Sequence, residues 1–317
     1  MKILVIGGAG YIGSHVTYEL CDKGYDITVL DNLSSGFLDN IDKRANFIKD
    51  SFSNKIIINE ILKDIDTVIH LAALKSAGES MDDPINYSNH NIIDTMNLIN
   101  CCLNNNVKNF IFSSSAAVYG MPEYLPIDEN HSLKPVNYYG FTKFLIEQQL
   151  LWCNQLKGLN IALLRYFNAA GYDIKGRIFK KERNPQNLFP IVMEVAAGVR
   201  TEMNVFGNDY DTPDGTCLRD YIHVNDLANG HVKALEMLSK NNKIITNLAT
   251  GKAHSVLDVI NKTKDITNTN IDFIITKRRH GDPDSLFAKS NGILNYKNKY
   301  SNLENIISSM WNIYKPT

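Results

Sequence analysis

The chain begins with Met1-Lys2-Ile3-Leu4-Val5-Ile6-Gly7-Gly8-Ala9-Gly10-Tyr11-Ile12-Gly13, a short apolar run followed by a glycine-rich turn. Residues 14–23 have helical patterning, and a second apolar run at 27–30 ends at Asp31. Glycines at such a turn let the backbone approach a pyrophosphate, and the N-terminus of the following helix attracts its negative charge. This order predicts a dinucleotide-binding unit. The alternative is an ordinary tight turn followed by a surface aspartate.

Asp31 indicates which dinucleotide the unit would bind. It lies eighteen residues after Gly13, where a carboxylate can accept hydrogen bonds from an adenosine ribose. The same carboxylate would repel a 2′-phosphate, so the sequence favours NAD over NADP.

Further apolar runs alternate with helical patterns along the first half of the chain. Strands are expected at residues 46–50, 66–73, 110–112 and 161–167, and helices at 92–105 and from about Tyr139. Such alternation predicts an α/β fold with a doubly wound parallel sheet, in which ligands collect at the carboxyl ends of the strands. The residues that fall at such ends are the turn glycines, Asp31, Asp50, Ala72, Ala73, Ser115 and Asn168.

After Asn168 the sequence becomes polar and irregular, and residues 210–215 have turn chemistry. Helices are expected near residues 188–197, 224–238 and 256–264. We therefore predict two domains, a dinucleotide-binding domain at 1–170 and a smaller C-terminal α/β lobe at 171–317. Some segments of the second are expected to cross back to the first.

Tyr139-Gly-Phe-Thr-Lys143 places a phenol and an ammonium one helical turn apart, downstream of Ser113-Ser114-Ser115. A phenol with its ordinary pKa of ~10 is a poor base at neutral pH. A nearby positive charge stabilises the phenolate and lowers that pKa toward the range of effective general-base catalysis. The set predicts a proton-transfer site, although Tyr-x-x-x-Lys alone also occurs on ordinary solvated helix faces.

The composition excludes several other classes of protein. With 33 basic and 34 acidic residues and no block of like charge, neither nucleic acid nor an anionic membrane is expected as a partner. No apolar run approaches the ~20 residues of a membrane span. The chain opens directly into a strand, so we expect a cytoplasmic enzyme without a signal peptide. The five cysteines are expected to be reduced, and no residues have the spacing of a metal site.

Seven segments resemble UDP-glucose 4-epimerases, a family of the extended short-chain dehydrogenase/reductases. They are Gly-Gly-Ala-Gly-Tyr-Ile-Gly-Ser-His at 7–15, Leu-Asp-Asn-Leu at 30–33, Ala-Leu-Lys-Ser-Ala-Gly-Glu-Ser at 73–80, Asn-Phe-Ile-Phe-Ser-Ser-Ser-Ala-Ala-Val-Tyr-Gly at 109–120, Leu-Leu-Arg-Tyr-Phe-Asn at 163–168, Phe-Gly-Asn-Asp-Tyr at 206–210 and Arg-Asp-Tyr-Ile-His-Val at 219–224. The resemblance covers nearly the whole chain and thins after about residue 290. It implies a Rossmann-type sheet that binds NAD, a lobe that binds a UDP-hexose, and a homodimer.

The resemblance also implies the catalytic roles. Tyr139 would take the proton of the sugar 4-hydroxyl, Ser115 would hydrogen-bond the same oxygen, and Lys143 would hold the nicotinamide ribose. The hydride would pass to NAD and return to the other face of a 4-keto sugar. The cofactor residues so implied are Gly7, Gly10, Tyr11, Ile12, Gly13, Asp31, Asn32, Leu33, Ser34, Ser35, Gly36, Asp50, Ser51, Leu71, Ala72, Ala73, Lys75, His90, Ser113, Tyr139, Lys143 and Phe167. His90 departs from the family, which usually has an Asn there, so either His90 or Asn91 is expected to make that contact.

By the same resemblance, a second set of residues would bind the substrate. It comprises Lys75, Ser115, Tyr139, Asn168, Asn187, Leu188, Asn204, Val205, Phe206, Arg219, Tyr221, Arg279, Asp282 and Leu286. Arginine suits a diphosphate because its planar fork binds two phosphoryl oxygens at once. For Arg278 and Arg279 the alternative is a simple solvent-facing pair, and for Lys75 an ordinary surface lysine.

Leu286 stands where many members of this family have a bulky Tyr that crowds the sugar C2 substituent. Leucine would admit an N-acetyl group, which predicts activity on UDP-GlcNAc and UDP-GalNAc as well. The alternative is that Leu286 is a core residue and Phe287 crowds the site. Two rival functions share the fold: another NAD-dependent nucleotide-sugar-modifying enzyme, a dehydratase or a decarboxylase, and a non-catalytic NAD-sensing protein. The dehydratase is disfavoured because Ser113-Ser114-Ser115 is followed by no carboxylate.

Overall fold

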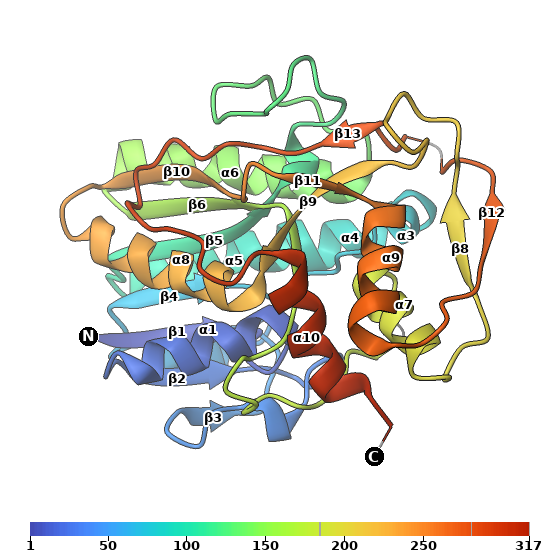
Figure 1. Ribbon diagram of the computed structural model, residues 1–317. Helices are drawn as coiled ribbons and strands as arrows, with labels where there is room; N and C mark the ends of the chain where they lie inside the picture. The colour runs from blue at the N-terminus through green and yellow to red at the C-terminus, as the bar shows by residue number, and fades with distance from the viewer. Residues whose placement is uncertain (184, 280, 317) are drawn as a thin grey trace.

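Residues 1–183, 185–279 and 281–316 are described by the computed structural model of the chain. Within these ranges seven strands form one sheet with all neighbours parallel, in the order β10-β6-β5-β4-β1-β2-β3 (Figure 1). They are β1 (Lys2–Ile6), β2 (Asp26–Leu30), β3 (Asn46–Ile48), β4 (Thr67–His70), β5 (Asn109–Ser115), β6 (Asn160–Tyr166) and β10 (Lys243–Leu248). The predicted doubly wound α/β fold is confirmed.

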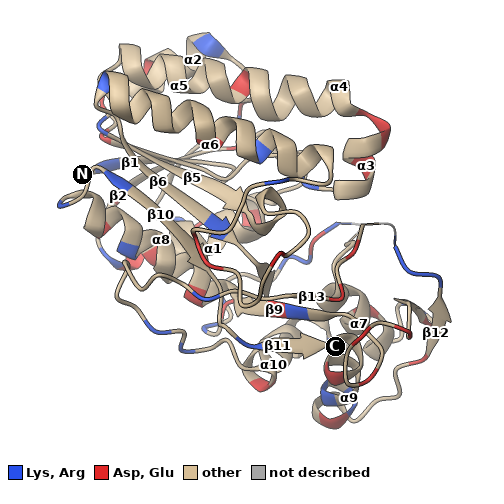
Figure 2. Cartoon of the chain, turned by 90° about the horizontal axis from the view of Figure 1, so that it is seen from above, with Lys and Arg blue, Asp and Glu red and all other residues tan. Residues whose placement is uncertain are grey.

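Helices cover both faces of this sheet (Figure 2). They are α1 (Tyr11–Asp22) and α8 (Val224–Leu238) on one face, and α2 (Lys55–Leu62), α5 (Asp94–Asn104) and α6 (Tyr138–Lys157) on the other. Val16 and Leu227 pack in the first apolar core, while Ile58, Leu98 and Ile146 pack in the second. Because both faces are buried, the strands are continuous apolar runs rather than alternating ones.

A smaller lobe follows the carboxyl end of the sheet. Its elements are β7 (Asn168–Ala170), α7 (Leu188–Ala196), β8 (Met203–Phe206), β9 (Leu218–His223), β11 (Ala253–Ser255), α9 (Val256–Thr267), β12 (Phe273–Thr276), β13 (Ser285–Leu286) and α10 (Leu303–Tyr314). β9 pairs with β7, β11 and β13, and β8 pairs with β12. The three helices share an apolar core that contains Phe189, Val192, Ile260 and Met310. No helix in the described ranges is long and apolar enough to cross a membrane.

Segments of the second half return to the first sheet. β10 pairs with β6 from Lys243 opposite Ile161 to Leu248 opposite Tyr166, and α8 packs beside α1. Crossing back therefore occurs through residues 224–248. The division of the chain at residue 170 stays a prediction.

The predicted and observed elements differ around the strand ends. β4 ends at His70 rather than at residue 73, because the N–H groups of Leu71 and Ala72 both donate to the carbonyl oxygen of Ile6. The helix expected at 92–105 is preceded by a π-helical turn, η2 (Ser88–Ile93). Short elements that the pattern did not predict are η1 (Leu38–Asn40), α3 (Ala77–Asp82), α4 (Pro84–Tyr87) and η3 (Ala116–Val118).

Candidate active site

The glycine-rich turn brings backbone segments into contact at the end of β1. Gly7 has φ of 82°, and a Cβ there would lie 2.8 Å from the backbone nitrogen of Ala72. A Cβ on Gly13 would lie 2.0 Å from the carbonyl oxygen of Gly7. No described side chain caps α1 at Gly10, so the N–H groups of its first turn can receive an anion.

Asp31 follows β2 and holds two neighbouring turns. Its Oδ2 accepts a hydrogen bond of 3.0 Å from the Ala9 N–H, and its Oδ1 accepts one of 2.7 Å from the Leu33 N–H. Leu33 has φ of 60°, a left-handed conformation that side chains rarely adopt without such support. Each carboxylate oxygen has a second acceptor position, so Asp31 can also receive a ribose hydroxyl.

A cavity of about 1370 Å³ lies at the carboxyl ends of the strands. The predicted site residues that line it are Gly7, Gly10, Tyr11, Ile12, Gly13, Asp31, Asn32, Ser34, Ser35, Asp50, Ser51, Leu71, Ala72, Ala73, Lys75, His90, Ser113, Asn187, Arg279 and Asp282. Those that lie outside this lining are Leu33, Gly36, Ser115, Tyr139, Lys143, Phe167, Asn168, Leu188, Asn204, Val205, Phe206, Arg219, Tyr221 and Leu286. The structure therefore gathers most of the predicted cofactor set around one cavity, whereas the lining does not include most of the predicted substrate set or the catalytic residues Ser115, Tyr139 and Lys143.

Tyr139 is held at the start of α6 by backbone contacts. Asn137 caps the helix, its Oδ1 accepting from the Gly140 N–H at 2.8 Å, and the Tyr139 N–H donates to Ser80 Oγ at 3.0 Å. Burial raises the pKa of the Tyr139 phenol, and a hydrogen bond with the Ser115 side chain opposes that rise. Ser115 ends β5, so a strand end and a helix start together place the phenol and the hydroxyl.

Lys143 is buried one turn further along α6. Its Nζ donates to the carbonyl oxygen of Ser113 at 2.8 Å and lies 5.9 Å from the centroid of the Tyr139 ring. Burial lowers the pKa of Lys143 to about 7, and the charge of Glu147 opposes that shift. The raised pKa of Tyr139 is the reverse of the lowering expected from the sequence. The reason is that burial disfavours the phenolate, while the ammonium is directed to the Ser113 carbonyl.

His90 and Asn91 have different surroundings in the π-helical turn. Asn91 is 5% exposed; its Oδ1 accepts from the Leu74 N–H at 2.9 Å, and its Nδ2 donates to the Leu74 carbonyl at 2.9 Å. His90 instead lines the cavity, with its ring edge-on to Phe52. Its buried Nδ1 has no hydrogen-bond partner among the described residues. His90 is therefore the residue of the two that presents a polar atom not already engaged.

The sequence reasoning missed one wall of the cavity, the irregular segment that contains Tyr172, Ile178, Lys180, Glu182 and Arg183. Glu182 forms an ion pair with Lys75, which was expected at a pyrophosphate. The two residues are 107 positions apart in the chain, so a local sequence pattern cannot predict their ion pair.

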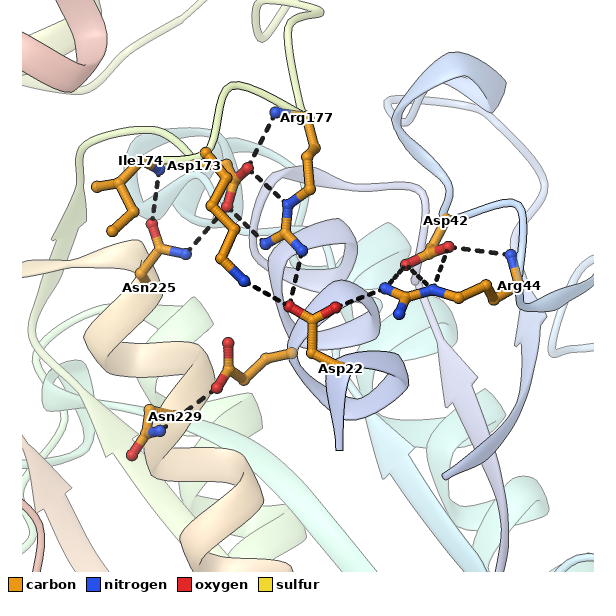
Figure 3. A network of polar contacts seen from close by, with 10 residues as sticks. Asp22, Asp42, Arg44, Asp173, Ile174, Arg177, Asn225 and Asn229 are labelled. Atoms are coloured by element: carbon orange, nitrogen blue, oxygen red, sulfur yellow. Dashed lines mark hydrogen bonds and ion pairs between the residues drawn. The ribbon is translucent and has the colours of Figure 1, made fainter. Parts of the chain in front are cut away.

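A polar network fixes the beginning of that segment to the end of α1 (Figure 3). The Asp22 carboxylate accepts hydrogen bonds from Arg44, Lys175 and Arg177 at 2.7, 2.9 and 2.8 Å. Arg177 also forms a two-bond pair with Asp173, through Nε at 2.9 Å and Nη2 at 2.8 Å. The cavity wall is therefore anchored by charge pairs on one side of the dinucleotide-binding unit.

The predicted arginines lie in the smaller lobe near the cavity. Arg219 donates from Nη1 to the carbonyl oxygen of Pro283 at 2.9 Å, and its Nη2 is 3.6 Å from Asp282 Oδ1. The guanidinium of Arg279 lies 3.9 Å from the centroid of the Phe206 ring. Arg219 thus pairs with Asp282, and Arg279 packs on Phe206. All four belong to the predicted substrate set. His280, between these arginines and Asp282, lies outside the described residues.

Other members of the predicted substrate set lie in the core of the smaller lobe, in a contact with its backbone, or at the ends of its elements. The side chains of Val205 and Tyr221 lie in the apolar core of the smaller lobe. Asn168 donates from Nδ2 to the Asp220 carbonyl at 2.9 Å. Asn187 precedes α7 and Leu188 begins it, while Asn204 is exposed in β8.

Comparison with known proteins identifies the family. The sequence model of the NAD dependent epimerase/dehydratase family matches residues 3–249. The chain belongs to this family. A UDP-glucose 4-epimerase of Halalkalibacterium halodurans is 43% identical over 321 residues, covering 99% of this chain and 96% of that protein. The crystal structure of UDP-glucose 4-epimerase from Bifidobacterium longum in complex with NAD+ and UDP has a TM-score of 0.94 at 36% identity, covering 99% of this chain and 98% of that one. The UDP-Glc/GlcNAc 4-epimerase of Campylobacter jejuni has a TM-score of 0.86 at 36% identity, with the same coverage.

The residues of this family member fit a dinucleotide. The turn at Gly7 and Gly13 leaves no room for a Cβ, the uncapped N-terminus of α1 lies beside it, and Asp31 borders the same cavity. Among the described residues no group of three or more His, Cys, Asp or Glu could hold a metal ion. The donor set is that of a pyrophosphate and ribose site.

Proposed function

We propose that the chain is a UDP-glucose 4-epimerase that interconverts UDP-galactose and UDP-glucose with tightly bound NAD. The observation that carries the proposal is the arrangement of Tyr139 and Lys143 on α6 beside Ser115 at the end of β5. The family match and the relatives named above support the same reaction.

Each residue of the set has one chemical task. Tyr139, as phenolate, takes the proton of the sugar 4-hydroxyl, and Ser115 hydrogen-bonds the same oxygen. The ammonium group of Lys143 binds the nicotinamide ribose. Bound NAD would supply the acceptor and donor of the C4 hydride, so the cycle would have no net oxidation. The protein must then let a 4-keto sugar turn over while it holds the nucleotide.

The nucleotide is assigned to the arginines of the smaller lobe. Arg219 and Arg279 offer planar forks to the diphosphate, and Asn187 at the start of α7 borders the cavity. Asp282 pairs with Arg219 and would hold that side chain ready for a phosphate. Firm binding of UDP and loose binding of the hexose suit a sugar that must rotate.

Incubation of the pure protein with UDP-galactose tests the reaction. Formation of UDP-glucose, without added cofactor and without net NADH, is expected. A dehydratase would instead release a 4-keto-6-deoxy sugar nucleotide, and a non-catalytic NAD-sensing protein would leave the substrate unchanged. Either result would replace the proposal.

The finer substrate assignment concerns N-acetylated sugars. Leu286, in β13, packs in an apolar cluster with Ala116 and Phe167, which adjoin Ser115 and Asn168 in sequence. This neighbourhood supports a contact with the sugar, and leucine is smaller than the tyrosine common at this place in the family. Activity on UDP-GlcNAc and UDP-GalNAc is accordingly proposed.

The predicted homodimer has support in the surface of two helices. Met96 on α5, and Phe141, Trp152 and Leu156 on α6, are large apolar side chains that are at least 39% exposed. Light scattering measures the molar mass of the wild type and of Trp152→Glu in solution. The wild type should have the mass of a dimer, and the substitution should shift it toward that of a monomer. The cytoplasmic location stays a prediction.

A further inference from the structure

Residues 178–183 line the cavity and have no task in the proposed mechanism. We call this segment the strap. It follows directly after Arg177, which Asp22 and Asp173 fix to the end of α1 (Figure 3). The side chain of Ile178, at its start, is 1% exposed and packs in the apolar core of the smaller lobe. The strap is therefore anchored to the smaller lobe while it lines a cavity at the end of the parallel sheet.

On one side, the strap is bound to the segment that follows β2. Asn40 is buried there; its Oδ1 accepts from the Lys180 N–H at 3.0 Å, and its Nδ2 donates to the Lys180 carbonyl at 3.2 Å. The guanidinium of Arg183 lies 4.5 Å from the centroid of the Phe37 ring, and both residues line the cavity. Because one side chain bonds both backbone groups of Lys180, the strap is fixed there in position and in orientation.

On the other side, the strap is bound to the loop that follows β4. Lys75 lies in this loop and forms the ion pair with Glu182. The Lys75 side chain is 60% exposed and that of Glu182 is 16% exposed, so the pair stands where the cavity meets solvent. Among the described residues no other ion pair or side-chain hydrogen bond joins the strap to this loop.

The order of the strands places the strap over the glycine-rich turn. β1 lies between β4 and β2 in the sheet, and the carboxyl ends of parallel strands meet at one edge. A segment bound to the loops after β4 and after β2 therefore spans the end of β1. The glycine-rich turn follows β1, and Gly7, Gly10 and Gly13 line the same cavity as the strap. This is where the pyrophosphate of a dinucleotide is expected.

We propose that the strap retains the dinucleotide, and that the Lys75–Glu182 ion pair is the latch that opens before NAD can leave. The proposal rests on the proposed function, since it takes the cavity to be the NAD site. The Lys75 ammonium has three N–H donors, so it can hold Glu182 and a pyrophosphate oxygen at the same time. NAD beneath the strap would then be released only when the ion pair breaks.

The charge of Glu182 gives the test its sign. A carboxylate beside a pyrophosphate repels it. If Glu182 had only this effect, its neutralisation would leave Lys75 free for the phosphates and slow the release of NAD. If Glu182 only stabilised the fold, its neutralisation would lower the melting temperature and leave the release rate unchanged. A latch predicts the third result, which is faster release.

Release of radiolabelled NAD distinguishes the three cases. Each purified protein is loaded with labelled NAD and diluted into an excess of unlabelled NAD, and the label that stays on the protein is followed by filtration. Glu182→Gln should release the label about two- to fivefold faster than the wild type, the range for a partly exposed ion pair. Glu79→Gln is the matched control, because it neutralises another carboxylate in the cavity lining that has no printed bond to the strap among the described residues. It should release NAD at the wild-type rate.

Asn40→Ala is a second variant, because it removes the contact of the strap on its other side and leaves the ion pair in place. It should also release NAD faster, and Asn40→Ala with Glu182→Gln should be faster than either single variant. Unchanged or slower release in Glu182→Gln or in Asn40→Ala, an equal acceleration in Glu79→Gln, or a wild type that retains no label overturns the proposal. Failure of the wild type to epimerise UDP-galactose would instead overturn the proposed function, and the exchange of NAD, which needs no substrate, separates the two results.

Discussion

Lys143 donates a hydrogen bond of 2.8 Å from Nζ to the carbonyl oxygen of Ser113, and this bond joins α6 to the end of β5. The lysine is 4% exposed, and burial lowers its pKa to about 7. A cation assigned to the reaction is therefore held where its charge is least stable. Function and stability make opposite demands on this side chain.

Replacing Lys143 with Met should change how stability depends on pH. The unfolded lysine has a pKa of ~10.4, so between about pH 7 and that value the unfolded chain binds more protons than the folded one. Wild-type stability should rise with pH across this window by up to ~1.4 kcal/mol per unit relative to Lys143→Met. At and below pH 7 the folded wild type bears the full cost of the buried charge. In that range the free energy of unfolding of Lys143→Met should exceed that of the wild type by the largest amount. Urea unfolding of the NAD-free proteins from pH 6 to 10 measures this, and a difference independent of pH would contradict it.

Replacing Tyr139 with Phe should remove the general base and little else. Turnover of UDP-galactose should fall by ~10²–10⁴-fold, the usual contribution of such a group, while the affinity for UDP stays the same. Stopped assays with calorimetric UDP titration measure both. Near-normal turnover in Tyr139→Phe would mean that another group takes the proton.

Local patterns were sufficient for the fold and for the cofactor loop. The run from Ile3 to Ile6, the glycine turn and Asp31 are close in sequence, so spacing alone predicts how they pack. The same holds for Tyr139 and Lys143, which one helical turn brings together. The Tyr139 pKa could not be predicted in this way, because its direction is set by burial under the completed fold.

Contacts between distant segments could not be predicted. Lys75 and Glu182 are separated by 107 positions, and Glu182 lies in a stretch with no periodic pattern. In the sequence, Arg165 is one polar residue in an apolar strand, and Glu147 is a charged residue in a helix. Nothing in the pattern indicates that the two form a buried ion pair. The assignment of His90 rather than Asn91 to the cavity depends on a π-helical turn, which apolar periodicity does not mark.

The bound nucleotide should be NAD and should survive purification. Asp31 borders the cavity and accepts from Ala9 and Leu33, so a 2′-phosphate would meet a fixed negative charge. Because the cycle has no net oxidation, NAD is regenerated in the site and need not be exchanged between turnovers. Denaturing the pure protein and separating the released nucleotides by chromatography measures this. Recovery of NADP, or of no dinucleotide, would be inconsistent with the proposed site.

Leu286 should decide whether N-acetylated sugars are accepted. Its side chain packs in the cluster that contains Phe167 and Ala116, whereas Phe287, the alternative residue, follows directly after the end of β13. The wild type should therefore turn over UDP-GalNAc as well as UDP-galactose. Phe287→Leu is the matched control, because it changes the size of the adjacent side chain and leaves Leu286 in place.

Leu286→Tyr should lose activity on UDP-GalNAc and keep activity on UDP-galactose. Overpacking of this kind costs ~1–3 kcal/mol, which corresponds to about a 5- to 150-fold fall in kcat/KM for the N-acetylated sugar alone. Separate kinetics with the two substrates for wild type, Leu286→Tyr and Phe287→Leu measure the ratio. Two results would remove Leu286 from the substrate site: an inert UDP-GalNAc with the wild type, or an equal loss of both activities in Leu286→Tyr. A selective gain of UDP-GalNAc turnover in Phe287→Leu would assign the crowding to Phe287 instead.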